Sequence, residues 1–192
     1  MKRKGIICIE TECEITKRNS RLNLNSEPLL QFLSKTYNIP YIYRKVATIE
    51  ELKYYFSQFK HRKEYNNNYS IFYFSFHGDT HAINFESGVS VDLNDILDLS
   101  DGLFEGKYVH FGSCRTMLGS SSVINHFYEV SGAKMVSGFT KKVESDLCAI
   151  HDMAFIAEII NCKQVPTILN HMKNYYGGLQ SKLGFRVVPN LE

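Results

Sequence analysis

Short apolar runs alternate along the chain with segments whose apolar residues recur at helical spacing. Because these runs are rich in β-branched and aromatic residues, they predict buried strands. The predicted strands cover residues 5–9, 39–43, 70–76, 108–111 and 134–137. The run at 70–76 is nearly all apolar, which suits a central strand buried on both faces. Pro40, near the start of the second run, predicts an edge strand.

Helical periodicity follows most of these runs. Leu52, Tyr55, Phe56 and Phe59 form one helical stripe behind a capping box that Thr48 opens. The other helices are predicted from turn and cap residues together with apolar spacing. The first of these helices begins at Ser26, with Pro28 in its first turn. The others cover 92–97, from 120–122 to Gly132, 145–160, and from Val165 to before 176–178.

This alternation predicts an α/β fold, a three-layer sandwich whose mainly parallel sheet carries helices on both faces. The apolar segments 83–85 and 89–91 predict a small hairpin, and the polar stretch 65–69 predicts a loop. The length of 192 residues suits one domain over 1–192. Residues 165–192 form a C-terminal extension whose structure the pattern does not fix.

Charge and cysteine usage narrow the class of protein. Lys and Arg total 22 against 20 Asp and Glu, a net charge of +2, which argues against a nucleic-acid or membrane-surface partner. No segment has the roughly 18 apolar residues of a membrane span, and the start lacks the apolar core of a secretory signal. We therefore expect a soluble, cytoplasmic protein. The spacings of the five cysteines predict neither a disulfide framework nor a structural zinc site. These cysteines are Cys8, Cys13, Cys114, Cys148 and Cys162.

Candidate catalytic residues follow two of the predicted strands. In parallel sheets, functional sites lie at the carboxyl ends of the strands. His77 follows the strand at 70–76, and Cys114 follows the strand at 108–111. A cysteine nucleophile needs an imidazole that takes and later returns the proton, which predicts these two residues as the catalytic pair. The backbone N–H groups of Gly78 and Cys114 are the predicted oxyanion donors. Gly112 and Ser113 are small enough to leave room for a peptide.

The pattern of an apolar strand ending in His-Gly, then one ending in a small residue and Cys, resembles caspase-like peptidases. That group includes caspases, metacaspases, gingipains, separases and bacterial CHAT domains. Caspases carry Gln-Ala-Cys-Arg-Gly at the nucleophile, about 50 residues after the His. Here residues 112–116 read Gly-Ser-Cys-Arg-Thr, so Cys-Arg is kept, the Gln and final Gly are not, and the spacing is shorter. The resemblance runs from the first strand to about Ile160.

The resemblance implies a caspase-like sheet and a cysteine endopeptidase, nearest to small bacterial CHAT-like domains. It implies protein or peptide substrates, a regulatory protein partner, and no cofactor or metal. By analogy with small bacterial caspase-like proteins, it also implies a role in stress or defence.

Substrate specificity is predicted from the segment 137–146, which partly floors the pocket for the residue before the scissile bond in caspase-like folds. Phe139, Val143 and Glu144 fit the CHAT pattern, with Asp146 as the competing acidic position. An acidic floor predicts cleavage after Arg or Lys. Carboxylates at a helix N-terminus are also favoured by the helix dipole alone. The remaining predicted substrate-binding residues are Ser113 and Ser137.

Other functions fit parts of the sequence. The departures around Cys114 fit a caspase-like interaction module without activity. The string from His77 through Asp79 to His81 fits a metal-dependent hydrolase, although histidines four apart share a face only on a helix. Cysteine is among the most buried residue types, so Cys114 also fits a core position. The residues for which a structural role is expected are Cys8, Cys148, His110 and the pair His151-Asp152, the last at a solvent-facing or core-edge position.

Overall fold

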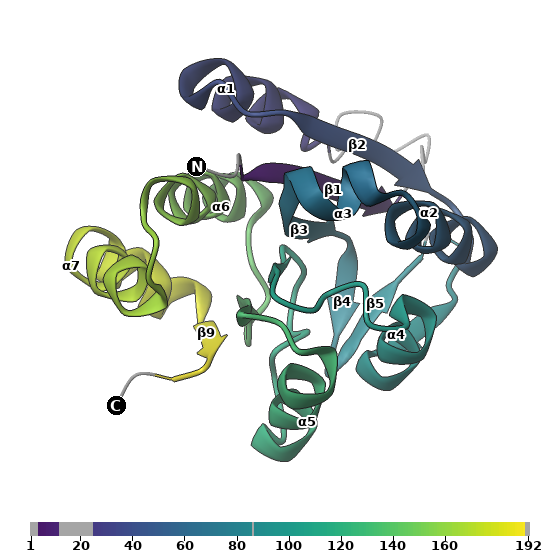
Figure 1. Ribbon diagram of the computed structural model, residues 1–192. Helices are drawn as coiled ribbons and strands as arrows, with labels where there is room; N and C mark the ends of the chain where they lie inside the picture. Colours follow the sequence, from purple (N-terminus) through teal and green to yellow (C-terminus); the bar gives the residue numbers. More distant parts are fainter. Residues whose placement is uncertain (1–3, 12–24, 86, 191–192) are drawn as a thin grey trace, which may run out of the picture.

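A computed structural model describes residues 4–11, 25–85 and 87–190, in which helices cover both faces of a six-stranded sheet (Figure 1). The strand order is β2-β1-β3-β7-β8-β9. The five strands from β2 to β8 in this order run parallel to one another, and β9 pairs antiparallel with β8. Their bounds are β1 Gly5–Thr11, β2 Tyr41–Val46, β3 Tyr69–Ser75, β7 Tyr108–Phe111, β8 Met135–Phe139 and β9 Phe185–Val188. The predicted α/β class is confirmed, and β2 lies at an edge as Pro40 predicts.

A second, three-stranded antiparallel sheet follows β3. It comprises β4 His77–Asp79, β5 Ala82–Asn84 and β6 Ser90–Asp92, in that order. The predicted hairpin is β5 and β6. The segment from His77 to Asp79, which follows β3, pairs with β5 as a third strand that the apolar pattern does not predict.

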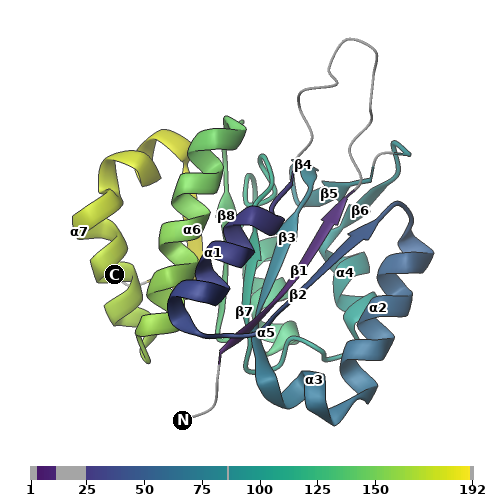
Figure 2. The ribbon, with the colours of Figure 1, turned by 90° about the horizontal axis from the view of Figure 1, so that it is seen from above.

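Helices pack on both faces of the large sheet, α1, α6 and α7 on one and α2, α4 and α5 on the other (Figure 2). The helices are α1 Glu27–Tyr37, α2 Ile49–His61, α3 Lys63–Asn68, α4 Leu93–Ser100, α5 Ser121–Ser131, α6 Ser145–Asn161 and α7 Val165–Leu183. Side chains alternate across a strand, so β1 supplies both layers. Ile7 and Ile9 face the α2 layer, whereas Ile6 and Cys8 face the α1 and α6 layer.

Two local predictions were wrong. In the polar stretch 65–69, residues 65–68 belong to a short helix, α3, where Tyr65 packs against Phe59, and Tyr69 begins β3. Helix α7 runs through Gly177-Gly178 and ends at Leu183, and its C-cap residue Gly184 has a positive φ of 66°. The predicted start of α1 at Ser26 is confirmed, because Ser26 is its N-cap residue, although the Ser26 hydroxyl donates to the Ser75 hydroxyl at 2.8 Å instead of capping the helix.

The C-terminal segment belongs to both layers of the core. Ile168 and Met172 of α7 are fully buried, and Val188 of β9 packs into the opposite cluster. Within the described part of the chain, every helix is too short or too polar to cross a membrane.

Candidate active site

A cavity of about 450 Å³ opens at the carboxyl ends of β3 and β7. Its walls come from the start of α1, the ends of these two strands, the loop after β8 and the first turns of α6. His77 and Cys114 both line it. The structure therefore brings the two predicted catalytic side chains to one cavity, between neighbouring parallel strands.

The turn that carries Cys114 is held from several sides. Arg115 has a positive φ of 59°, and its N–H donates to the Lys141 carbonyl at 3.1 Å. The Thr116 hydroxyl donates to the Ala82 carbonyl at 3.1 Å, which joins the turn to β5. The Val143 N–H donates to the Cys114 sulfur at 3.4 Å. The sulfur is thus fixed in the cavity wall with a backbone donor beside it.

Strand β4 presses against the same turn. A β-carbon built on Gly78 would lie within 3 Å of atoms of Ser113, Cys114 and Thr116. Only a residue without a side chain allows this approach. Because His77 precedes Gly78 directly, the contact also sets the backbone of His77 beside the Cys114 turn.

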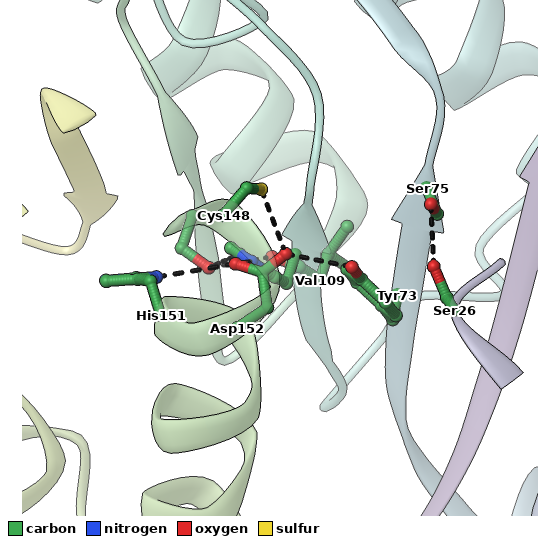
Figure 3. A network of polar contacts seen from close by, with 9 residues as sticks. Ser26, Tyr73, Ser75, Val109, Cys148, His151 and Asp152 are labelled. Carbon is green, nitrogen blue, oxygen red and sulfur yellow. Dashed lines mark hydrogen bonds and ion pairs between the residues drawn. The ribbon is translucent and has the colours of Figure 1, made fainter. Parts of the chain in front are cut away.

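At the floor of the cavity lies a buried polar network centred on the fully buried Asp152 (Figure 3). The Tyr73 hydroxyl donates to Oδ2 at 2.8 Å, and the Cys148 thiol donates to the same oxygen at 3.4 Å. His110 Nε2 lies 2.8 Å from Oδ1, and His151 Nδ1 lies 3.4 Å from it. The carboxylate thus joins β3, β7 and α6.

In this network Asp152 is an ionised carboxylate, and the Tyr73 hydroxyl and the Cys148 thiol are neutral donors. Burial raises the pKa of Asp152, but the charge and hydrogen bonds of His110 and His151 outweigh it and keep that pKa well below its usual range. Burial and the Asp152 charge raise the pKa of the Tyr73 hydroxyl and of the Cys148 thiol. Cys148 is therefore a protonated donor, not a thiolate nucleophile.

This network touches the strand end that leads to Cys114. Tyr73, Gly112 and Cys148 line the cavity, while Asp152 lies behind them. A β-carbon on Gly112 would lie 2.6 Å from the Tyr73 ring and 2.8 Å from Asp152 Oδ2. The network thus buttresses the floor of the cavity.

The predicted substrate-binding residues are separated by the structure. Asp146 lines the cavity, whereas Glu144 is an exposed residue at the N-cap of α6 outside the lining. Ser113 and Ser137 are fully buried and bond within the protein, to Thr116 at 2.6 Å and to His110 at 2.9 Å. Neither serine lines the cavity, and both hydroxyls are occupied by contacts within the protein.

The metal-hydrolase alternative lacks its ligand set. Two groups among the described residues place three ligand atoms within 4.8 Å of one another, and neither includes His77, Asp79 or His81. His81 Nε2 instead accepts the Ser120 N–H at 3.1 Å.

The buried network was not found from the sequence, which predicted a solvent-facing or core-edge position for His151 and Asp152. Both are fully buried. A signal was available: α6 is apolar over so wide a face that a polar pair within it had to be buried and therefore partnered.

The fold is that of caspase-like proteins. The structure matches the crystal structure of the Drosophila initiator caspase Dronc with a TM-score of 0.57 and 13% sequence identity, over 88% of this chain and 71% of that chain. The chain belongs to the family described as "Family of unknown function (DUF6642)", whose sequence model matches residues 3–188. None of the curated proteins matches the chain.

Proposed function

We propose that the protein is a cysteine endopeptidase in which Cys114 is the nucleophile and His77 the general base and acid. The observation that carries the proposal is that both side chains line one cavity at the ends of neighbouring parallel strands. The caspase-like fold supports it. Protein or peptide substrates and a regulatory protein partner are part of the proposal.

The chemistry needs no group beyond these residues and water. His77 takes the Cys114 thiol proton while the sulfur attacks the scissile carbonyl carbon. The Gly78 and Cys114 N–H groups stabilise the oxyanion. His77 then gives its proton to the departing amine, and a thioester remains. Water, deprotonated by His77, attacks the thioester, and the acid product and the Cys114 thiol are released.

We further propose that the cavity takes a basic side chain from the substrate residue before the scissile bond. Asp146 is the acidic lining residue that carries this specificity. A cationic side chain near Asp146 would gain a charge-assisted hydrogen bond.

The test measures hydrolysis of a fluorogenic peptide panel together with iodoacetamide labelling of each cysteine. Cys114 should label ahead of Cys8 and Cys148, which are buried with raised thiol pKa values. Cys114→Ala should abolish hydrolysis, and His77→Ala should lower it by about 10²-fold or more. His126→Ala, an exposed histidine on α5, is the matched control and should change neither readout.

The competing function is a caspase-like interaction module without activity. The observation that favours it is the Cys114 turn, where buried Thr116 stands in place of the caspase glycine. In that case no peptide is cleaved, and Cys114 labels at the same rate with and without His77. That result would overturn the peptidase proposal and leave the fold unaffected.

A further inference from the structure

At the opposite end of α6 from the cavity, three ligand-type side chains converge. Glu158 lies in the last turn of α6, and Cys162, one turn later, is its C-cap residue. His171 comes from the neighbouring α7, which packs beside α6 (Figure 1). His171 Nδ1 lies 2.8 Å from Glu158 Oε2, and the Cys162 sulfur lies 3.4 Å from that oxygen and 3.8 Å from Nδ1.

The three side chains form a triangle of contacts and are not arranged as in a catalytic triad. In a catalytic triad the carboxylate and the nucleophile bind opposite nitrogens of the imidazole. Here the carboxylate oxygen and the sulfur both approach Nδ1 of His171. The three atoms therefore face one common point.

The triangle has the dimensions of a metal site. Tetrahedral zinc, with bonds of about 2.0–2.3 Å to nitrogen, oxygen and sulfur, separates its ligand atoms by about 3.3–3.6 Å. The three observed distances lie within about half an ångström of that range, an adjustment that side-chain rotation supplies. A mixed sulfur, nitrogen and oxygen set in this geometry suits zinc better than calcium or magnesium, which prefer oxygen alone.

We propose that Glu158, Cys162 and His171 bind one zinc ion, with water as the fourth ligand. A thiolate and a carboxylate balance the two charges of the ion. The side chains of His171 and Glu158 are 38% and 20% exposed, which gives the ion and its water access. Lys4 fixes the end of α6 by donating to the carbonyls of Ile159 and Cys162.

The site is separate from the proposed peptidase chemistry. Cys148 lines the cavity and Cys162 lies fourteen positions later, which is about 20 Å along a helix. Bound zinc would tie the end of α6 to α7 and so to β9, the last strand of the sheet. Sequence spacing alone predicts no zinc site here, because the ligands come from two helices.

The experiment titrates chelator-treated full-length protein with Zn²⁺ by calorimetry and with Co²⁺ by absorption. It uses the Cys114→Ala background, so that the candidate nucleophile cannot contribute. We expect one equivalent of metal per chain, a thiolate-to-cobalt charge-transfer band, and a thermal midpoint that rises with Zn²⁺ concentration. Cys162→Ser should remove the band, and His171→Ala should weaken Zn²⁺ binding by about tenfold or more.

His126→Ala is the matched control, because its ring is exposed on α5 and should leave binding unchanged. Far-ultraviolet circular dichroism reports whether each variant is folded, and Glu158→Gln serves as a third, nearly isosteric variant. The proposal is overturned if neither metal binds, or if the cobalt band survives Cys162→Ser. It is also overturned if His171→Ala and Glu158→Gln, both folded, bind Zn²⁺ as the parent does.

Discussion

The backbones of Gly78 and Cys114 are in direct contact: a β-carbon built on Gly78 would lie 2.4 Å from the Cys114 carbonyl oxygen. Since the obstacle is backbone, Gly78→Ala forces β4 and the Cys114 turn apart. We expect a loss of stability of about 1–3 kcal/mol, the usual cost of overpacking. We also expect slower Cys114 labelling, because His77 moves with β4. Urea unfolding and iodoacetamide kinetics measure the two effects.

Gly177→Ala is the matched control for this substitution. Gly177 lies inside α7, and a β-carbon there meets nothing within 4 Å. Alanine should therefore stabilise the protein by about 0.5–1 kcal/mol through helix propensity, with Cys114 labelling unchanged. Equal effects of the two substitutions would contradict the role given to the Gly78 contact.

The buried carboxylate of Asp152 predicts a ranked pair of stability losses. Asp152→Asn leaves His110 without its charged partner, and breaking such a buried pair costs about 3–5 kcal/mol. Tyr73→Phe removes one hydrogen bond to the same carboxylate and should cost less, about 1.5–3 kcal/mol. Exposed Asp98→Asn should change stability by no more than about 0.5 kcal/mol. Denaturant unfolding gives all three values, and a larger loss for Tyr73→Phe than for Asp152→Asn would contradict the assignment.

Much of the fold could be predicted because its information is local. The apolar run at 70–76 and the helical spacing from Leu52 to Phe59 are each recognisable within a few residues, and both elements form as expected. Strand β4 could not be predicted in this way. It is three residues long, includes Gly78, and exists through pairing with β5. Pairing of this kind depends on tertiary context that local propensity does not contain.

In the candidate site, too, only the residues with a local sequence signal could be predicted. His77 and Cys114 could be proposed as partners because each ends a recognisable strand, and parallel strands end at one edge. Asp152 could not, because its contacts come from Tyr73 and His110 on two strands distant in sequence. Glu144 and Asp146 look equivalent in sequence, and both are exposed, but of the two only Asp146 lines the cavity, because Glu144 is the N-cap residue and Asp146 lies in the first turn of α6.

The pH dependence of stability follows from His151. Burial lowers the pKa of His151 in the folded protein below its unfolded value of about 6.5. The unfolded chain then binds a proton first as the pH falls, so this stability is present above pH about 6.5 and is lost below it. His81, whose pKa burial also lowers, adds a loss of the same sign. Asp152, with a depressed pKa, loses its contribution only below pH about 4.

His151→Phe tests this account. The His151 ring packs against Phe155 and Phe185, and its Nε2 has no hydrogen-bond partner among the described residues. A phenyl ring of similar shape should fit there and cannot titrate. Thermal midpoints between pH 7 and pH 5 should therefore fall less in the variant than in the parent protein. A parallel fall in both proteins would assign the pH dependence to other groups.

The two acidic residues at the start of α6 give the sharpest test of specificity, because only Asp146 lines the cavity. Glu144 is exposed outside it and serves as the matched control. Both carboxylates lie near the same helix N-terminus, so Asp146→Asn and Glu144→Gln should lose similar stability, about 0.3–1 kcal/mol. Their effects on substrate choice should differ. A charged hydrogen bond worth about 1.5–3 kcal/mol corresponds to roughly 10- to 150-fold preference for Arg or Lys over a neutral isostere. Asp146→Asn should lose most of that preference in kcat/KM, and Glu144→Gln should keep it. A preference for Asp, or a basic preference unchanged in Asp146→Asn, would remove Asp146 from the specificity pocket.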